Sequence, residues 1–231
     1  MTTLIIPSRC RVPLLTRCIE SLKLTKPQPM WTIVLADQDQ ETYDYACVAR
    51  EWPWWSGGLT PILSEQRLGL WQGLNSVFSW VALIEDHPFV FVGDDVVFAS
   101  DWLAQAEACW KAHFPDGLGL LSFNDGIQFH GNASHFMTTR RWLYVIFGEP
   151  FFPREYWHHF CDSELTVRSR DGFGRYHYCE SSIVTHHWEP SGQNYSLDHD
   201  DYKTKERRHA EWTQGGLAAA RARLAEMQRA S

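Results

Sequence analysis

The sequence predicts an α/β fold, with a mostly parallel central sheet flanked by helices. Short apolar runs alternate with longer amphipathic segments through the first half of the chain. The run Thr3–Pro7, for example, precedes the segment Val12–Leu24, whose apolar residues recur at helical spacing. Strands separated by helices of roughly ten to fifteen residues form βαβ units, which build parallel sheets. Acidic residues follow two of these strands directly, which also suits this fold.

Each element expected in the first half has a local signal. Pro7 ends the first apolar run, Pro88 precedes the fourth, and Ser100 is a good N-cap for the last helix. The expected strands are 3–7, 31–36, 60–63 and 89–92, and the expected helices are 12–24, 41–51, 70–84 and 101–113.

The second half changes character, and its strands are expected to form a smaller mixed sheet. The expected strands are 117–123, 134–139 and 175–187, and the expected helices are 140–147, 156–172 and 211–229. We therefore expect one domain over residues 1–190, made of two halves, 1–115 and 116–190. Residues 191–231 would be an extension that contains a helix.

The composition is that of a soluble globular protein, with 44% hydrophobic and 21% charged residues among 231. The net charge of −7 argues against a general polyanion binder, which needs clustered Lys and Arg. The six cysteines show no metal-ligand spacing and are expected to be reduced thiols. Neither a signal peptide nor a membrane span is evident, so a cytoplasmic location is expected. Some of the 12 Trp are expected to line a ligand groove.

Carboxylates at two strand ends predict a ligand site. Asp37 follows the strand "WTIVLA", and Asp94 and Asp95 follow the strand "FVFVG". In open α/β sheets the ligand crevice lies beyond the carboxyl ends of the strands. Two adjacent carboxylates repel each other unless a positive group neutralises them. A divalent cation, Mg²⁺ or Mn²⁺, does so while it also holds substrate phosphates.

At this point the sequence resembles the GT-A glycosyltransferases, specifically the family 2-like group, over residues 3 to about 190. The opening strand, loop and helix of that family are similar to "LIIPSRCRVPLLTRCIESL", and its strand ending in Asp is similar to "IVLADQD". Its Asn-x-Gly-x-x-x-Ala-x-Asn segment resembles "EQRLGLWQGLN", and its metal motif resembles "FVFVGDDVVFASDWL", where Gly93 stands in place of the usual first Asp. Later segments of the family resemble "HFMTTRRWLYVIFG" and "CDSELTVRSRDGFGRYHYCESSIVTHH".

The resemblance implies a metal-dependent inverting transfer of a sugar from a nucleotide-diphosphate sugar to an acceptor hydroxyl. Asp95 falls on the metal-ligand position, with His186 or His187 as a closing ligand, and Asp162 falls on the catalytic-base position. Asp37 would contact the base or ribose, and Asp94 the nucleotide. The chemistry agrees, because a cation neutralises the leaving phosphates and a carboxylate takes the acceptor proton.

The rest of the proposed nucleotide site and the acceptor are less specific. The loop that follows Pro7 is expected to face the nucleoside half, and Arg9 and Arg67 are candidates to pair with phosphate or base. Small transferases of this kind include bacteriophage enzymes that glycosylate hydroxymethylated DNA bases, which would place this one in the host cytoplasm. The cluster Trp52, Trp54 and Trp55 could stack on such bases or on sugars.

Other function classes stay open at the level of sequence. A metal-dependent nuclease or phosphohydrolase would use Asp94, Asp95, Asp162 and His187. A nucleotidyltransferase would need a glycine-rich phosphate loop after the first strand, and "PSRCRVP" has no glycine. A binding module that lacks activity is suggested by Gly93, while the retained Asp95 and Asp162 argue against it.

Overall fold

The computed structural model describes residues 2–80, 87–128, 131–156, 160–187 and 199–230. Its first half contains β1 (Thr3–Ser8), α1 (Val12–Leu22), β2 (Trp31–Asp37), α2 (Gln40–Arg50), β3 (Gly58–Ser64), α3 (Leu70–Trp80), β4 (Phe89–Phe91), β5 (Val96–Phe98) and α4 (Trp102–His113). Its second half contains β6 (Leu120–Asn124), β7 (Phe136–Thr138), α5 (Arg140–Phe147), α6 (Cys161–Val167), β8 (Tyr176–His186), α7 (His199–Glu211) and α8 (Leu217–Ala230).

Within the described residues the strands form one eight-stranded sheet with the order β3-β2-β1-β4-β7-β6-β8-β5. The strands β3, β2, β1 and β4 pair in parallel, as the sequence predicts. The strand β7 is antiparallel to both of its neighbours, and β6 therefore runs in the same direction as β4. The strands of the second half thus continue the same sheet as a mixed part, in which β7 and β5 are antiparallel to their neighbours.

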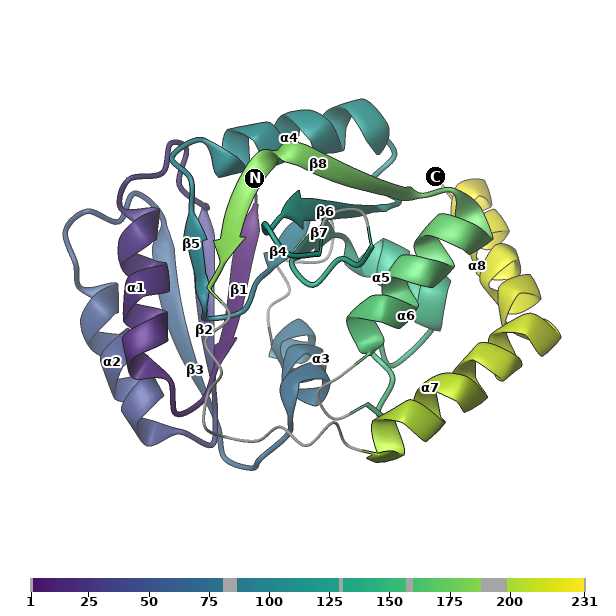
Figure 1. Cartoon of the computed structure of the whole chain (residues 1–231), viewed down its shortest axis with the longest axis horizontal. Helices are drawn as coiled ribbons and strands as arrows, with labels where there is room; N and C mark the ends of the chain where they lie inside the picture. The colour runs from purple at the N-terminus through teal and green to yellow at the C-terminus, as the bar shows by residue number, and fades with distance from the viewer. Residues whose placement is uncertain (1, 81–86, 129–130, 157–159, 188–198, 231) are drawn as a thin grey trace.

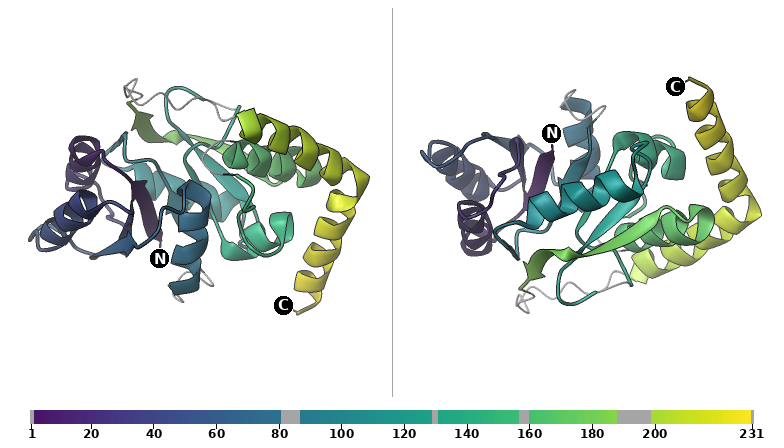
Figure 2. Two further views of the ribbon diagram at one scale, coloured as in Figure 1. Left: turned by 90° about the horizontal axis from the view of Figure 1, so that it is seen from below. Right: turned by 90° about the horizontal axis from the view of Figure 1, so that it is seen from above.

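Helices cover both faces of this sheet, and each face has its own apolar core (Figure 1). The helices α1, α2 and α4 pack on one face, where buried residues include Leu15, Ile19 and Trp102. The helices α3, α5 and α6 pack on the other, around Trp71 and Trp142. Burial on both faces explains why the central strands read as continuous apolar runs. Figure 2 shows α1 and α2 on the opposite side of the sheet from α3.

The largest differences from the sequence-based expectation lie in the last third of the chain. The helix expected over 156–172 is shorter, since α6 begins at Cys161 after Phe160, which adopts a left-handed conformation with φ of 68°. It then continues as a π-helical segment, Arg168–Gly172. The tail helix expected over 211–229 begins only at Leu217, as α8. An unpredicted helix, α7, precedes it, and the two meet at a bend where Gly215 has non-helical backbone angles.

Two further observations concern the chain as a whole. Cys109 and Cys179 form a disulfide that joins α4 to β8, with Cα atoms 6.3 Å apart, so the expectation of reduced thiols is wrong for this pair. The sequence could not show it, because the two residues are 70 positions apart and meet only through the sheet. Within the described residues no helix is long and apolar enough to cross a membrane.

Candidate functional site

Several of the predicted site residues lie at one edge of the sheet. The strands β1, β2, β4 and β6 point their carboxyl ends to this edge, and β8 ends there at His186. Asp95 lies in the short connection between β4 and β5, and β5 pairs with the end of β8. Segments far apart in the sequence therefore supply the side chains of a single site.

The acid pair is held by an arginine from the first loop. Arg11 contacts Asp94 at 3.2 Å through one guanidinium nitrogen and Asp95 at 2.5 Å through the other. The hydroxyl of Ser8, at the end of β1, donates to Asp94 at 2.7 Å. Both carboxylates are buried. Since one guanidinium faces two carboxylates, the group keeps one net negative charge when all three are ionised.

The two carboxylates differ in their readiness to ionise. Burial raises the pKa of Asp94 to about 6, although Arg11 and Ser8 favour its charged form. Burial also opposes the ionisation of Asp95, but the contacts of His186 and Arg11 outweigh it and hold the pKa of Asp95 well below its usual range. Both carboxylates are therefore mostly charged at neutral pH, but Asp94 takes up a proton as the pH falls through about 6, whereas Asp95 stays charged.

The geometry separates the two candidate histidines. The Nε2 atom of His186 lies 3.4 Å from Oδ2 of Asp95. His187 instead has an exposed side chain, and its backbone N–H donates to the carbonyl of Asp95 at 2.8 Å. In an octahedral Mn²⁺ or Mg²⁺ site, two neighbouring ligand atoms lie about 3.0 Å from each other. The 3.4 Å between Oδ2 of Asp95 and Nε2 of His186 is close to this value, so the two side chains could share a cation. An oxygen and an imidazole nitrogen also suit Mn²⁺.

Gly93 leaves room for this arrangement. A Cβ atom at position 93 would lie 2.7 Å from Oδ1 of Asp95 and 3.5 Å from the ring of His135. A side chain there would displace the carboxylate of Asp95. The missing first acid of the resembled motif thus has a steric reason in this chain.

Behind His186 lies a second group of polar side chains that the sequence reasoning missed. Asp125 and His135 are both buried, and one ligand atom from each lies within 4.8 Å of a ring nitrogen of His186. Nδ1 of His135 accepts the backbone N–H of Gly93 at 3.2 Å. Burial lowers the pKa of His135 to about 4. The ring is therefore neutral, with its proton on Nε2.

Two further carboxylates at this edge organise loops. Asp37 accepts the backbone N–H groups of Leu68 and Gly69 at 2.8 and 3.1 Å, which fixes the segment before α3. Asp39 accepts the backbone N–H of Cys10 at 2.5 Å and the hydroxyl of Thr42.

Three other candidates for nucleotide binding lie near these loops. Pro7 is within β1, just before the loop, and its side chain is half-buried. The Nε atom of Arg9 is buried, without a hydrogen-bond partner among the described residues. Arg67 is exposed in the loop that Asp37 fixes.

Asp162 lies in the first turn of α6 and is anchored from the segment before β7. Its Oδ2 accepts from Asn132 at 2.7 Å and from Ser134 at 3.5 Å. Thr166 ties the same segment to α6, because its hydroxyl donates to Asn132 and accepts from the backbone of Ala133. The residues 132–135 therefore contact Asp162 at one end and the Asp95 group, through His135, at the other. Four residues span at most about 10 Å even when fully extended.

A buried ion-pair network holds α6 against the C-terminal helices. Glu164, two residues after Asp162, accepts two bonds from Arg208 of α7, at 2.8 and 2.9 Å. It also accepts from the hydroxyl of Tyr156 at 2.6 Å and pairs with Arg168. The side chain of Glu164 is only 9% exposed. The C-terminal extension thus fixes the helix that carries the proposed base.

Sequence signals existed for some of the residues that were missed. Arg11 lies in the loop after Pro7, which the sequence already placed at the carboxyl end of the first strand. Asp125 directly follows β6 at the same sheet edge where Asp37 ends β2 and Asp94 comes after β4. His135 had no such signal, because it precedes an antiparallel strand whose direction the sequence does not reveal.

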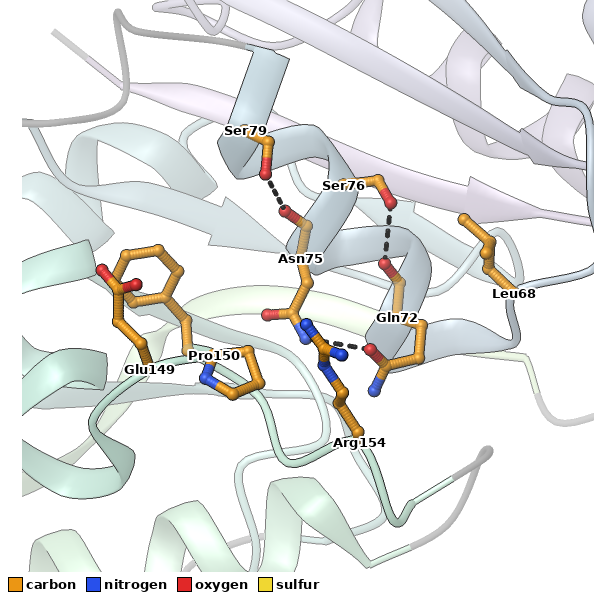
Figure 3. Close-up of a pocket in the computed structure, with 9 residues that line it drawn as sticks. Leu68, Gln72, Asn75, Ser76, Ser79, Glu149, Pro150 and Arg154 are labelled. Carbon is orange, nitrogen blue, oxygen red and sulfur yellow. Dashed lines mark hydrogen bonds between the residues drawn. The ribbon is translucent and has the colours of Figure 1, made fainter.

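A separate cavity of about 390 Å³ lies between α3 and the loop that follows α5 (Figure 3). Asn75 joins the two walls of the cavity through its side-chain amide. The amide N–H donates to the backbone carbonyl of Phe152 at 2.8 Å, and the amide oxygen accepts the backbone N–H of Phe152 at 2.9 Å. Leu68 lines the cavity, and its backbone N–H donates to the carboxylate of Asp37. Its lining residues are Leu68, Gln72, Asn75, Ser76, Ser79, Glu149, Pro150, Phe151 and Arg154.

The tryptophan cluster lies away from this edge. Trp52, Trp54 and Trp55 precede β3, so they stand at the amino end of the parallel strands. Their half-buried rings pack against the core face of α1 and α2, and Trp54 stacks on Trp55 with ring centroids 4.3 Å apart. Trp55 donates its indole N–H to the carbonyl of Ala49. These contacts give the cluster a packing role.

Solved structures of known proteins share this fold. A mannosyltransferase from Pyrobaculum calidifontis, in complex with GDP-Man and Mn²⁺, matches 100% of this chain and 75% of its own with a TM-score of 0.67 and 17% identity. GalNAc-T7 with UDP, GalNAc and Mn²⁺ matches 83% of this chain with a TM-score of 0.66 and 12% identity. TarS 1-349 from S. aureus, in complex with UDP-GlcNAc, matches 84% with a TM-score of 0.63 and 15% identity.

These likenesses establish the fold, which is the GT-A type that the sequence predicted. The chain spans 60% of the TarS fragment and 44% of GalNAc-T7. No protein-family model and no curated protein sequence matches the chain.

Proposed function

We propose that the protein is an inverting glycosyltransferase that uses a nucleotide-diphosphate sugar and a divalent cation. One observation carries this proposal. Asp95 and His186 lie together at the carboxyl edge of the sheet, and the segment 132–135 connects them to Asp162. The three matched glycosyltransferase structures contain a nucleotide or nucleotide sugar, and two of them also contain Mn²⁺.

In this proposal Asp95 and His186 would hold the cation, which would neutralise the negative charge of the leaving diphosphate. Arg11 keeps the acid pair at one net negative charge, so the site still attracts a cation. Its guanidinium lies against both carboxylates and could also donate hydrogen bonds to a phosphate of the donor. Asp37, Asp39 and the loop after Pro7 surround the nucleoside, with Arg9 and Arg67 at its border.

In the transfer reaction Asp162 acts as the general base. The acceptor oxygen attacks the anomeric carbon from the side opposite the diphosphate, so the configuration inverts. As that bond forms, the acceptor proton moves to the carboxylate of Asp162, and the electron pair of the broken C–O bond leaves with the diphosphate. Asn132 and Ser134 hold the carboxylate in place for this transfer.

The acceptor is proposed only as a molecule that offers a hydroxyl group. A hydroxymethylated DNA base is the narrower hypothesis from the sequence, and the contacts give it no support. The tryptophan cluster lies at the other edge of the sheet, and Arg207 and Arg208 pair with Glu155 and Glu164. An assay with hydroxymethylated DNA beside simple saccharides would test that hypothesis directly.

Nucleotide binding provides the first experiment. We expect GDP or UDP, or one of their sugars, to raise the melting temperature in the presence of Mn²⁺. A ligand at 100 times its Kd adds about 2.7 kcal/mol of stability. Asp95→Ala should lose this shift, and Asp162→Asn should keep it. The proposed cation site fails if Asp95→Ala keeps the full shift, and the proposed function fails if no nucleotide binds the parent protein.

A hydrolase remains the second candidate, because the same carboxylates and cation could activate water. Product analysis separates the two activities. A transferase yields free nucleoside diphosphate and a glycosylated acceptor with inverted configuration, whereas a phosphohydrolase would release nucleoside monophosphate or cleave a phosphodiester.

A further inference from the structure

Two buried ring nitrogens near the proposed cation site have no hydrogen-bond partner among the described residues. They are Nε2 of His135 and Nδ1 of His186. Buried polar atoms normally find a partner, so each unsatisfied one calls for an explanation. The rings meet edge to face, with centroids 4.8 Å apart.

Asp125 is the carboxylate that stands beside both rings. One of its oxygens, Oδ1, accepts the backbone N–H groups of Ile127 and Gln128 at 2.8 and 2.7 Å. Its carbonyl accepts the N–H of His186 at 3.0 Å. The carboxylate is therefore fixed in position, and its ligand atom lies within 4.8 Å of those of His135 and His186.

The hydrogen-bond pattern decides which of these residues can bind a cation directly. Because the N–H of Gly93 donates to Nδ1 of His135, the proton of that neutral ring is on Nε2, which then has no lone pair for a metal. His186 differs, since its Nε2 faces Asp95. When that nitrogen binds a cation, the ring proton must be on Nδ1, and Asp125 has a carboxylate oxygen within 4.8 Å of a nitrogen of this ring.

We propose that Asp125 is a positioning residue for the cation ligand His186, accepting the proton on its Nδ1, with His135 as a second donor to the same carboxylate. A carboxylate behind a metal-bound histidine fixes the ring orientation and the tautomer. In the metal-free protein the proton is on Nε2 and faces Asp95; with the cation bound, it is on Nδ1 and faces Asp125. This inference rests on the proposed function only through the cation site.

Mn²⁺ affinity of the purified protein, measured from the free-ion EPR signal without nucleotide and again with GDP or UDP, tests the proposal. We expect Asp125→Asn to weaken binding roughly 10- to 100-fold. The amide of Asn would offer N–H to Nδ1 and so favour the wrong tautomer, as in the Asp→Asn variant of a serine-protease triad, a known example. Asp171→Asn is the control, because it removes one exposed charge elsewhere.

Two further variants separate a supporting role from direct ligation. His186→Ala should abolish binding. His135→Asn, whose side-chain oxygen can still accept the N–H of Gly93, should weaken it less than 10-fold. If His135→Asn is as damaging as His186→Ala, His135 is a direct ligand and the proposal is wrong.

The tautomer itself gives an independent readout that does not depend on activity. In ¹⁵N-resolved NMR spectra, binding of diamagnetic Zn²⁺ should move the His186 proton from Nε2 to Nδ1 in the parent but not in Asp125→Asn. Unchanged Mn²⁺ affinity in a folded Asp125→Asn protein would overturn the proposal and leave the transferase function intact. A parent protein that transfers sugar but binds neither ion would overturn it as well. Absence of nucleotide-sugar turnover with normal ion binding would instead count against the proposed function alone.

Discussion

At the scale of single residues, single side chains at the candidate site each contact more than one partner. Asp95 contacts both Arg11 and His186, so any shift of its carboxylate disturbs two interactions at once. Gly93 permits that position because it has no side chain. The sequence indicated the acid pair and its edge of the sheet, but not Arg11 as their partner, because that contact joins residues 84 positions apart.

Gly93→Ala tests this dependence. The added Cβ would lie 2.7 Å from Oδ1 of Asp95, closer than a carbon and an oxygen can pack, so the carboxylate must move. We expect at least a 10-fold loss of Mn²⁺ affinity, or about 1.4 kcal/mol. Gly58→Ala is the control, because its nearest contact would be an ordinary 3.8 Å. Equal affinities in the two variants would show that the carboxylate adapts without cost.

Asp162→Asn tests the proposed base. An amide has almost the same shape and can still accept the bond from Asn132, but it cannot take the acceptor proton. A positioned base contributes ~10²–10⁴-fold, so kcat should fall by that factor while binding of the nucleotide sugar survives. Steady-state kinetics and a product of inverted configuration check both parts. Transfer at the parent rate, or a product with retained configuration, would contradict this role.

At the scale of elements, strands and helices in the first half followed from apolar periodicity, and those near the C-terminus did not. The strands β1, β2 and β4 begin as the sequence predicted because they are buried on both faces. The helix α7 went unpredicted because its stability comes from tertiary contacts, including the buried pairing of Arg208 with Glu164. Such a helix is polar along most of its length and has little apolar periodicity.

Arg208→Met tests the contribution of that pairing. Removing one partner of a buried ion pair costs ~3–5 kcal/mol, because it leaves the other charge without full compensation. For a chain of this size the melting temperature should fall by roughly 10 °C. The neighbouring Arg207→Met is a matched control, since its pairs are exposed and worth below about 1 kcal/mol. If both variants lose equally little stability, the Arg208–Glu164 ion pair does not contribute measurably to the stability of the fold.

At the scale of the whole molecule, one sheet joins the proposed nucleotide half to the proposed acceptor half. The strand β8 closes this unit, because it pairs with β6 on one side and with β5 on the other. The sequence predicted the α/β class correctly, since strand and helix periods alternate along the chain. It could not predict that β8 bridges two distant strands, because strand order depends on contacts between residues far apart in sequence.

The disulfide between Cys109 and Cys179 gives the last prediction. It connects the helix α4, after β5, to β8, so it closes a loop of 70 residues through both halves. In the chain-entropy account, a cross-link over such a loop stabilises the folded state by about 4 kcal/mol. Cys109→Ser should therefore lower the urea midpoint, and dithiothreitol should lower that of the parent but not of the variant.

Cys47→Ser serves as the control, because Cys47 is a free thiol on α2. Thiol titration of the denatured, unreduced parent should find four of the six cysteines free. Six titratable thiols, or a parent midpoint that dithiothreitol leaves unchanged, would contradict the cross-link. Since the bond lies at α4 and β8 and not among the side chains around Asp95, its reduction should leave Mn²⁺ affinity unchanged below the unfolding transition.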